Sequence, residues 1–155
     1  MKYPAIAVLL TLTLSLNAQA ANQVLVKRLK ESHQCVGCNL RKADLKGFYL
    51  RQANLRGANL AGATLNGADL RGAFLNKANL TGADLRNANL EDANLEDAKL
   101  EGAQLKNARL SDRTTLAQKW RLVWLLVNRG IGGTEVFVSG LAEANLDKPN
   151  LKKIN

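Results

Sequence analysis

The chain of 155 residues is poor in the side chains that most catalytic sites need. It has one histidine, His33, and two cysteines, Cys35 and Cys38. Nucleophile pairs of the Ser-His or Cys-His kind would all depend on that single histidine. We therefore expect no catalytic residues, no cofactor and no resident metal, and the shortage argues against an enzyme.

The sequence also lacks an apolar run long enough to cross a membrane, which takes about 20 residues in a helix. Its long apolar run covers 5–16 and lies between Lys2 and the tripeptide Ala18-Gln19-Ala20. A positive start, a short apolar centre and an A-x-A end are the parts of a signal peptide, which we predict for 1–20. An uncleaved membrane anchor is the alternative. No cysteine follows the run directly, which argues against a lipoprotein.

Charge of one sign is not concentrated anywhere, although the formal net charge is +9. Residues 38–112 contain 11 Lys or Arg and 9 Asp or Glu. The remaining basic excess is divided between 21–37 and 113–155, apart from the single charge of Lys2. A nucleic-acid-binding protein usually gathers its basic residues into a patch. The distribution therefore favours a mildly basic, soluble surface.

What the sequence does contain is a repeat. Leucine occupies every fifth position from Leu40 to Leu110. Two residues before each leucine lies alanine, replaced only by Cys38 and Phe48. Two residues after each leucine lies Gly, Asn or Asp, with three exceptions: Lys42, Gln52 and Lys77. Such a fixed internal period is typical of a repeat protein.

A period of five fits neither regular element. On a helix it would spread the leucines around the axis. On a flat strand an odd period would send successive leucines to opposite faces. A chain that is extended for about three residues and turns every five keeps leucine, and the small residue two before it, pointing inward. The position two after leucine is then a corner, where Gly, Asn and Asp tolerate a left-handed backbone.

Four such sides close a square, so that residue n stacks over residue n+20. Residues 38–112 make fifteen sides, with leucine ladders such as Leu40-Leu60-Leu80-Leu100 inside. A disordered low-complexity tract is the alternative. Such tracts lack a large apolar residue at every fifth position, which argues against it.

The A-(D/N)-L-x-x pattern resembles that of the pentapeptide-repeat family. It is seen in Ala58-Asn59-Leu60-Ala61-Gly62 and in Ala83-Asp84-Leu85-Arg86-Asn87. The resemblance covers 38–112 in one run. It implies an all-β fold, a right-handed quadrilateral β-helix. The handedness comes from the family, since the spacing alone predicts only the square.

Both ends of a solenoid expose unpaired strand edges and need covers. We assign 21–37 to an N-terminal cap, because Val24, Leu25 and Leu29 fall among charged residues as in a short amphipathic helix. Phe48 takes an inward position in the first coil, so we expect it to fill space beneath this helix.

The pattern becomes helical again from about Arg113 to Arg129. Apolar residues then fall on one side of the helix: Leu116, Trp120, Val123, Trp124 and Val127, with Leu126 at the edge. The two tryptophans either pack against the solenoid or form a binding platform. The segment 118–124, followed by Val127 and Asn128, resembles an insertion of cyanobacterial pentapeptide-repeat proteins.

After this helix the repeat returns one residue out of phase, at Leu141, Leu146 and Leu151. We therefore predict that 113–138 are an inserted amphipathic helix with a return strand, and that 139–155 are resumed repeats.

The segment Cys35-Val36-Gly37-Cys38 is the one motif whose side chains could take part in a chemical reaction. In a secreted chain an even number of cysteines favours a disulfide, which would here join the cap to the first coil. Free buried thiols are the alternative. A thioredoxin-like redox pair lacks its βαβ context, and haem attachment lacks a histidine at Asn39. A metal site that included His33 would have three ligands and no fourth.

Outward charges give the predicted column two unlike halves. The first coil is basic, through Arg41, Lys42, Lys46, Arg51 and Arg56, and an acidic band lies further on: Glu91, Asp92, Glu96, Asp97 and Glu101. Stacking predicts a pair between Arg71 and Glu91, and Leu125 projects into the polar face of the helix. We take Arg51, Arg56, Arg71 and Leu125 as a candidate contact surface. Unlike halves also suit head-to-tail self-association.

These features predict a non-catalytic scaffold or protein-binding solenoid outside the cytoplasm, in the periplasm or the thylakoid lumen. We expect a protein partner, no nucleic acid, and no stable membrane insertion once the signal peptide is removed. Two alternatives remain. One is a DNA mimic that modulates a topoisomerase, as some members of the family do through an acidic surface, which the basic charge and the signal peptide disfavour. The other is a thiol-disulfide protein that uses Cys35 and Cys38.

Overall fold

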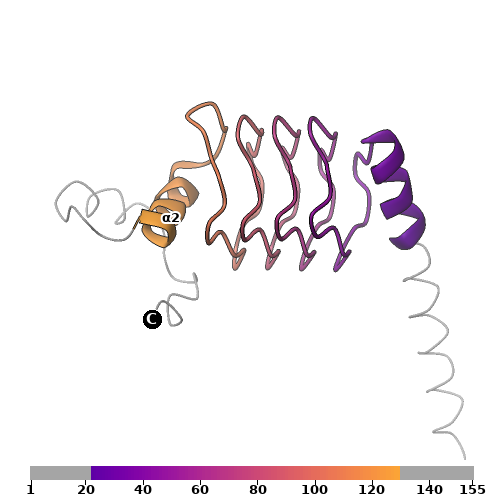
Figure 1. Ribbon diagram of the computed structural model, residues 1–155, viewed down its shortest axis with the longest axis horizontal. Helices are drawn as coiled ribbons and strands as arrows, with labels where there is room; N and C mark the ends of the chain where they lie inside the picture. Colours follow the sequence, from indigo (N-terminus) through magenta and orange to yellow (C-terminus); the bar gives the residue numbers. More distant parts are fainter. Residues whose placement is uncertain (1–21, 130–155) are drawn as a thin grey trace, which may run out of the picture.

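The computed structural model describes residues 22–129, which form a column of stacked coils with a helix at each end (Figure 1). The N-terminal helix occupies 22–32, and the second helix, α2, spans Gln118–Arg129. The predicted signal peptide, return strand and resumed repeats lie outside the described residues. Within 22–129, no helix is long and apolar enough to span a bilayer.

Each coil closes after twenty residues, as the leucine spacing predicts. Parallel bridges join Gln34 to Asn54, Asn54 to Phe74, and continue in the same step as far as Asn89 and Arg109. From Leu40 to Leu95, the amide of each ladder leucine donates to a carbonyl of the next coil, as Leu40 does to Asn59 at 2.8 Å. Across 22–129 the sides pair through single bridges and not through continuous strands, because a side holds only about three extended residues before it turns.

The predicted corners are confirmed. From Lys42 to Asn107, every position two after a leucine has a left-handed backbone, with φ between 55° and 70°. Glycine takes this conformation freely, and Asn and Asp tolerate it. Lys42 and Lys77 adopt it too, with φ of 56° and 61°. The stack therefore imposes the corner even on side chains that do not favour it.

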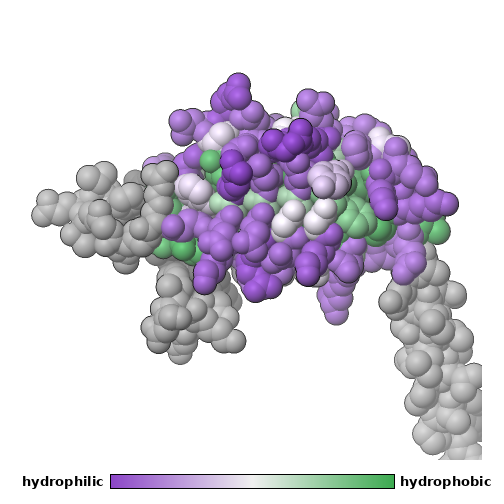
Figure 2. Space-filling view, in the orientation of Figure 1, coloured by the Kyte–Doolittle hydropathy of each residue, from purple (hydrophilic) through white to green (hydrophobic). Residues whose placement is uncertain are grey.

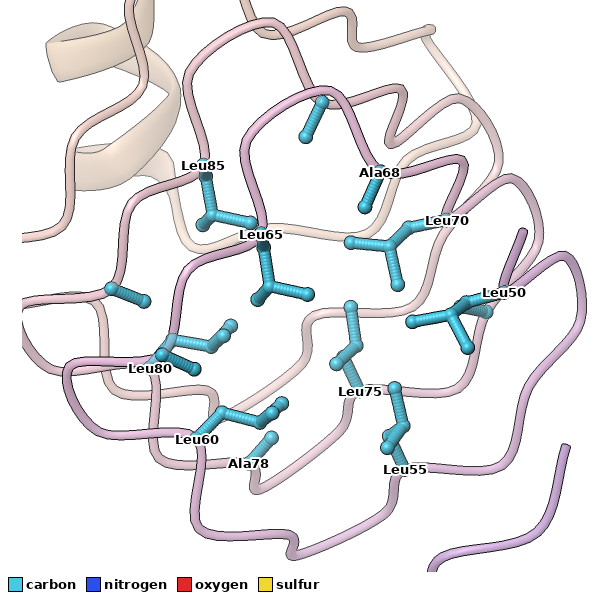
Figure 3. Close-up of a cluster of buried hydrophobic side chains, with 14 of the residues drawn as sticks. Leu50, Leu55, Leu60, Leu65, Ala68, Leu70, Leu75, Ala78, Leu80 and Leu85 are labelled. Carbon is cyan, nitrogen blue, oxygen red and sulfur yellow. The ribbon is translucent and has the colours of Figure 1, made fainter. Parts of the chain in front are cut away.

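Leucine and alanine fill the interior of the column (Figure 3). From Leu40 to Leu105 each ladder leucine is at most 4 % exposed, and the alanines from Ala53 to Ala93 are fully buried. Burial of one leucine contributes about 1.5–3 kcal/mol before chain entropy is considered. Because alanine alternates with leucine around each coil, the narrow bore is packed without room for a ligand.

The residue before each leucine has its own role. In eight described sides its Oδ1 accepts the N–H two residues later, as Asp44 does from Lys46 (3.1 Å) and Asn94 from Glu96 (2.9 Å). This bond satisfies an amide that the neighbouring coils do not pair, which explains the preference for Asn and Asp at this position.

The N-terminal helix covers the first coil. Its buried Leu29 belongs to the core, and the half-buried Phe48 packs against that core. The helix ends at His33, whose left-handed backbone (φ 55°) lets its N–H donate to the Leu29 carbonyl at 2.9 Å. The ladder starts immediately afterwards, at Gln34, inside the segment that we assigned to the cap.

At the other end, 113–117 form one more side of the stack. Thr115 bridges Asn94, a step of 21 residues, because one extra residue follows Leu110. Thr114 takes the inward alanine position, is 2 % exposed, and donates its hydroxyl to the Leu90 carbonyl at 2.9 Å. The helix therefore begins at Gln118, later than the predicted start near Arg113, and Leu116 belongs to the stack.

Within the described residues, side chains of α2 take the place of a further coil. Trp124 Nε1 donates to the Ala108 carbonyl at 2.6 Å, and Asn128 Nδ2 donates to the Leu105 carbonyl at 3.0 Å. Asn128 Oδ1 accepts the amide of Asn107. Trp120, 9 % exposed, joins the core cluster. Both tryptophans thus pack on the solenoid, and polar groups of its last coil are satisfied.

Candidate functional site

The two cysteines lie inside the first coil. The Cys35 amide donates to the Asn54 carbonyl at 2.8 Å, as a ladder leucine would, and Cys38 occupies the inward alanine position. Their sulfurs are 2.03 Å apart and their Cα atoms 5.2 Å apart. Cys35 therefore belongs to the repeat and not to the cap, so the bond joins two sides of one coil. This differs from the expected link between cap and coil.

Burial determines what this pair can do. Cys35 is 0 % exposed and Cys38 is 8 % exposed. Thiol-disulfide exchange requires a sulfur that an attacking thiolate can reach. The position of the pair in the core therefore argues for a structural role. In the part of the chain that the structure describes, no three His, Cys, Asp or Glu side chains come together as metal ligands.

Two of the candidate arginines share one carboxylate. Arg51 Nε lies 2.7 Å from Asp69 Oδ2, and Arg71 donates to both Asp69 oxygens, at 2.9 and 2.7 Å. Asp69 is largely buried by them, with 15 % of its side chain exposed. The arginines come from neighbouring coils on the same side of the column, so Asp69 fixes their relative position.

The expected pair between Arg71 and Glu91 does not form. Glu91 instead accepts from Arg109 at 2.8 Å, on the coil above it. Asp69 lies two residues before Arg71 and points outward on the same side of the column. Its two carboxylate oxygens each accept one hydrogen bond from the Arg71 guanidinium. This local partner outcompetes a residue one coil away.

The third candidate, Arg56, lies over an aromatic ring. Its guanidinium carbon is 4.9 Å from the centroid of Phe74, and its Nε donates to Asn76 Oδ1 at 3.2 Å. Phe74 is 38 % exposed and stands on the side that follows the Arg71 side around the corner. Tyr49, 80 % exposed, bridges Asp69 from the coil below.

We call this group the arginine–aromatic surface: Tyr49, Arg51, Arg56, Arg71 and Phe74. It covers two consecutive sides that meet at the corner formed by Gln52 and Gly72. The fourth candidate, Leu125, is not part of it. Leu125 is partly buried and belongs to α2, at the far end of the column from the N-terminal helix (Figure 1).

The two aromatic residues escaped the sequence analysis. Both occupy the outward position before leucine, where Asn and Asp are usual. The replacement of Asn or Asp by an aromatic residue is the feature of the sequence that could have identified them. Figure 2 shows how polar the surface is: on the face in view, hydrophilic side chains predominate and paler small residues run between them. Exposed rings are therefore exceptions to the pattern of this surface.

Elsewhere on the column, carboxylates are held in the charged form. The Arg86 guanidinium, bonded to both Asp84 oxygens, holds the pKa of Asp84 below its ordinary range. The Ser111 hydroxyl, and after it Arg113, lowers the pKa of Asp92. Such pairs fix surface side chains, and none stands in a cleft with a nucleophile or a base as an active site requires.

These features define a closed repeat solenoid with an outward-facing surface. The family model of pentapeptide repeats matches 34–72 and 73–112, with eight copies of its unit. The chain therefore belongs to the pentapeptide-repeat family. Its members form right-handed quadrilateral β-helices and are in general structural or binding proteins, not enzymes.

Three of the solved structures that the chain resembles come from cyanobacteria and a plant. The pentapeptide repeat protein Rfr23 from Cyanothece 51142 is 27% identical, over 60% of this chain and 97% of its own, with a TM-score of 0.42. One from Nostoc PCC 7120 is 33% identical, over 61% and 83%, with a TM-score of 0.34. One from the Arabidopsis thaliana thylakoid lumen is 33% identical, over 65% and 83%, also with 0.34. No curated protein matched the chain.

Proposed function

We propose that the protein is a non-catalytic scaffold outside the cytoplasm that binds a protein partner through the arginine–aromatic surface. One observation carries the proposal: Tyr49 and Phe74 are exposed beside three arginines, two of which Asp69 holds in place. Aromatic residues and arginine are the types that most often contribute the binding energy of protein interfaces.

The packing of the column supports a role for its surface. Leucine and alanine occupy the interior, and a helix covers each end. A substrate therefore has no route into the bore. Binding must use the outward positions, which on this family's fold form flat sides with regular spacing.

The side chains of the surface are arranged before any partner arrives. Asp69 bonds Arg51 and Arg71, and Phe74 supports Arg56. Side chains already held in one geometry lose less entropy on binding, which favours affinity. Three arginines and one aspartate leave this surface positive. We therefore infer a partner that offers carboxylates around an apolar contact for the rings.

The location outside the cytoplasm rests on two features. Residues 1–20 have the charge and apolar pattern of a signal peptide. The Cys35–Cys38 pair suits an oxidising compartment such as the periplasm or the thylakoid lumen. Disulfides are rare in the cytoplasm, where thiols are kept reduced.

The test is partner capture from the exported fraction of the source cell, with two matched variants. Arg71→Ala and Arg86→Ala each remove an arginine that an aspartate two residues earlier holds by the same bonds, but only Arg71 lies on the arginine–aromatic surface. We expect Arg71→Ala to weaken capture about tenfold or more, and Arg86→Ala to leave it unchanged. Equal losses, or a chain resident in the cytosol, would refute the proposal.

A further inference from the structure

The end of the column that bears the N-terminal helix carries unpaired positive charge. Five exposed cations gather there, on the helix and the first coil: Arg28, Lys30, Arg41, Lys42 and Lys46. Within 22–129, no carboxylate lies within 4.0 Å of any of their nitrogens. Lys27 adds a sixth cation, whose contact with Glu31 is long, at 4.0 Å.

Most arginines elsewhere on the column are paired with a carboxylate. Arg51, Arg71, Arg86, Arg109 and Arg113 each bond an acidic side chain at 2.7–2.8 Å. Counted from His33, the third coil covers 73–92 and carries Asp84, Glu91 and Asp92 against the basic Lys77 and Arg86. Exposed lysines without a carboxylate partner also occur on the later coils, at Lys77, Lys99 and Lys106, but these are spread apart, whereas the unpaired cations at the end with the N-terminal helix are clustered. A free charge cluster attracts anionic surfaces over about a Debye length, whereas paired charges largely cancel.

The shape of this end suits a broad contact. Lys27, Lys30 and Lys42 line an open groove between the helix and the first coil, together with the apolar Val26 and Ala43 and one carboxylate, Asp44. Val24, on the outer side of the helix, is 68 % exposed. Lysines around apolar side chains on a helix are the pattern of segments that lie in a membrane interface.

The type of cation distinguishes between partners. Lysine is a hydrated point charge on a flexible stem, whereas arginine provides a rigid fork for specific carboxylate geometry. Most of the unpaired cations at this end are lysines, and no described side chain holds them in place by an ion pair, although Lys30 Nζ lies 5.8 Å from the centroid of the Phe48 ring. Such charges suit the diffuse field of anionic lipid headgroups better than one defined site on a protein.

We propose that the N-terminal helix and the first coil dock the protein peripherally on an anionic membrane surface, with the column standing away from the bilayer. In this orientation α2 points away from the membrane, since it lies at the opposite end (Figure 1). Tyr49 and Arg51 of the arginine–aromatic surface lie on the side of the first coil, whereas Arg56, Arg71 and Phe74 lie on later coils, away from the membrane, and stay free for a partner. Docking at the surface is separate from the partner binding proposed above, and either can hold without the other.

The test is sedimentation of the exported protein with phosphatidylcholine vesicles that contain phosphatidylglycerol, or with phosphatidylcholine alone. The protein is purified from the exported fraction, and its N-terminus is checked by mass spectrometry. Lys30→Glu/Lys42→Glu/Lys46→Glu alters the proposed surface. Lys77→Glu/Lys99→Glu/Lys106→Glu changes the net charge equally on later coils, again at exposed, unpaired lysines. Lys42 and Lys77 are even matched as left-handed corners.

We expect binding to the anionic vesicles only, weakened by salt, and lowered about tenfold by the first variant but less than about twofold by the second. Circular dichroism must show that both variants are folded. If a signal segment is retained, it contributes equally to the vesicle binding of both variants. Equal losses in the two variants would overturn the proposal in favour of net charge alone. Failure of the wild type to bind vesicles would also overturn it, and binding to polyglutamate instead would indicate an acidic protein.

Discussion

Cys35 lies directly beneath Leu55 in one of the inner ladders. The coils above it carry leucine at this position, namely Leu55, Leu75 and Leu95. The amide of Cys35 donates to the carbonyl of Asn54 at 2.8 Å, the same step by which Leu55 reaches Phe74. The first pentapeptide is therefore His33 to Gly37, with Gly37 as its corner (φ 64°). Its disulfide occupies the space that leucine and alanine fill elsewhere.

This register makes the disulfide replaceable. We expect Cys35→Leu/Cys38→Ala to fold with a stability within about 1.5 kcal/mol of the wild type, because it restores the residues that the ladder normally carries. The loop that the bond closes is short, so little chain entropy is lost with it. Thermal unfolding with and without reductant measures the effect. The wild type should respond to reductant and the variant should not.

Cys35→Ser/Cys38→Ser is the control for that experiment. It places two hydroxyls in the core without partners, which costs about 1–3 kcal/mol for each buried group. If the serine variant were as stable as the leucine–alanine variant, Cys35 would not occupy an inward ladder position.

Substitutions in the middle of the column test the filled bore. Leu65→Ala leaves a cavity among fully buried neighbours and should lower the free energy of unfolding by about 2–5 kcal/mol. Thr64→Ala, at the adjacent outward position, should change it by less than about 0.5 kcal/mol. Urea unfolding followed by circular dichroism gives both values. A small loss for Leu65→Ala would mean that the bore is not packed as described.

The C-terminal cap can be tested at a single amide. Asn128 Oδ1 accepts the N–H of Asn107, in place of a carbonyl from a next coil. Asn128→Ala should therefore speed hydrogen exchange at Asn107. The amide of Asn87, the equivalent corner one coil below, donates to the Lys106 carbonyl at 3.0 Å and should keep its exchange rate. Unchanged exchange at Asn107 would contradict the role of Asn128 as a cap.

Stability should fall in acid through two surface carboxylates. The pKa of Asp84 and that of Asp92 are lower in the folded protein than the ordinary value of 3.8. Their charged forms therefore stabilise the fold above the unfolded pKa, and this contribution is lost as the pH falls through the folded pKa.

The measurement is the urea midpoint across a series of pH values. Asp84→Asn/Asp92→Asn should start from a lower midpoint at neutral pH and decline less below about pH 4 than the wild type does. If the urea midpoints of variant and wild type fell equally as the pH is lowered, the two carboxylates would not be the cause of the loss of stability in acid.

The interior of the column was predictable because leucine at every fifth position admits few geometries. The start was not, since His33 and Cys35 replace alanine and leucine and hide the first pentapeptide. The extra residue after Leu110 breaks the phase, so Leu116 was counted on the helix although it extends the stack. The five-residue repeat therefore predicts which residues stack on one another only where no residue is inserted and the usual residue types are present.

The surface was less predictable than the core, because register places residues but does not choose between their partners. Arg71 stacks beneath Glu91 as expected, yet Asp69 on its own side binds it. The cap contacts of Trp124 and Asn128 depend on how α2 lies across the last coil, which no repeat encodes. Sequence can therefore nominate outward residues, while their pairing requires coordinates.

The most direct measurement is photocrosslinking in the exported fraction, with a photoreactive phenylalanine analogue in place of Tyr49 or, as the control, of Thr81. Both positions are exposed, but they lie on different sides of the column, and only Tyr49 belongs to the arginine–aromatic surface. We predict one reproducible protein adduct from position 49 and none of that mass from position 81. Equal adducts from both positions, or none from position 49, would contradict binding through this surface.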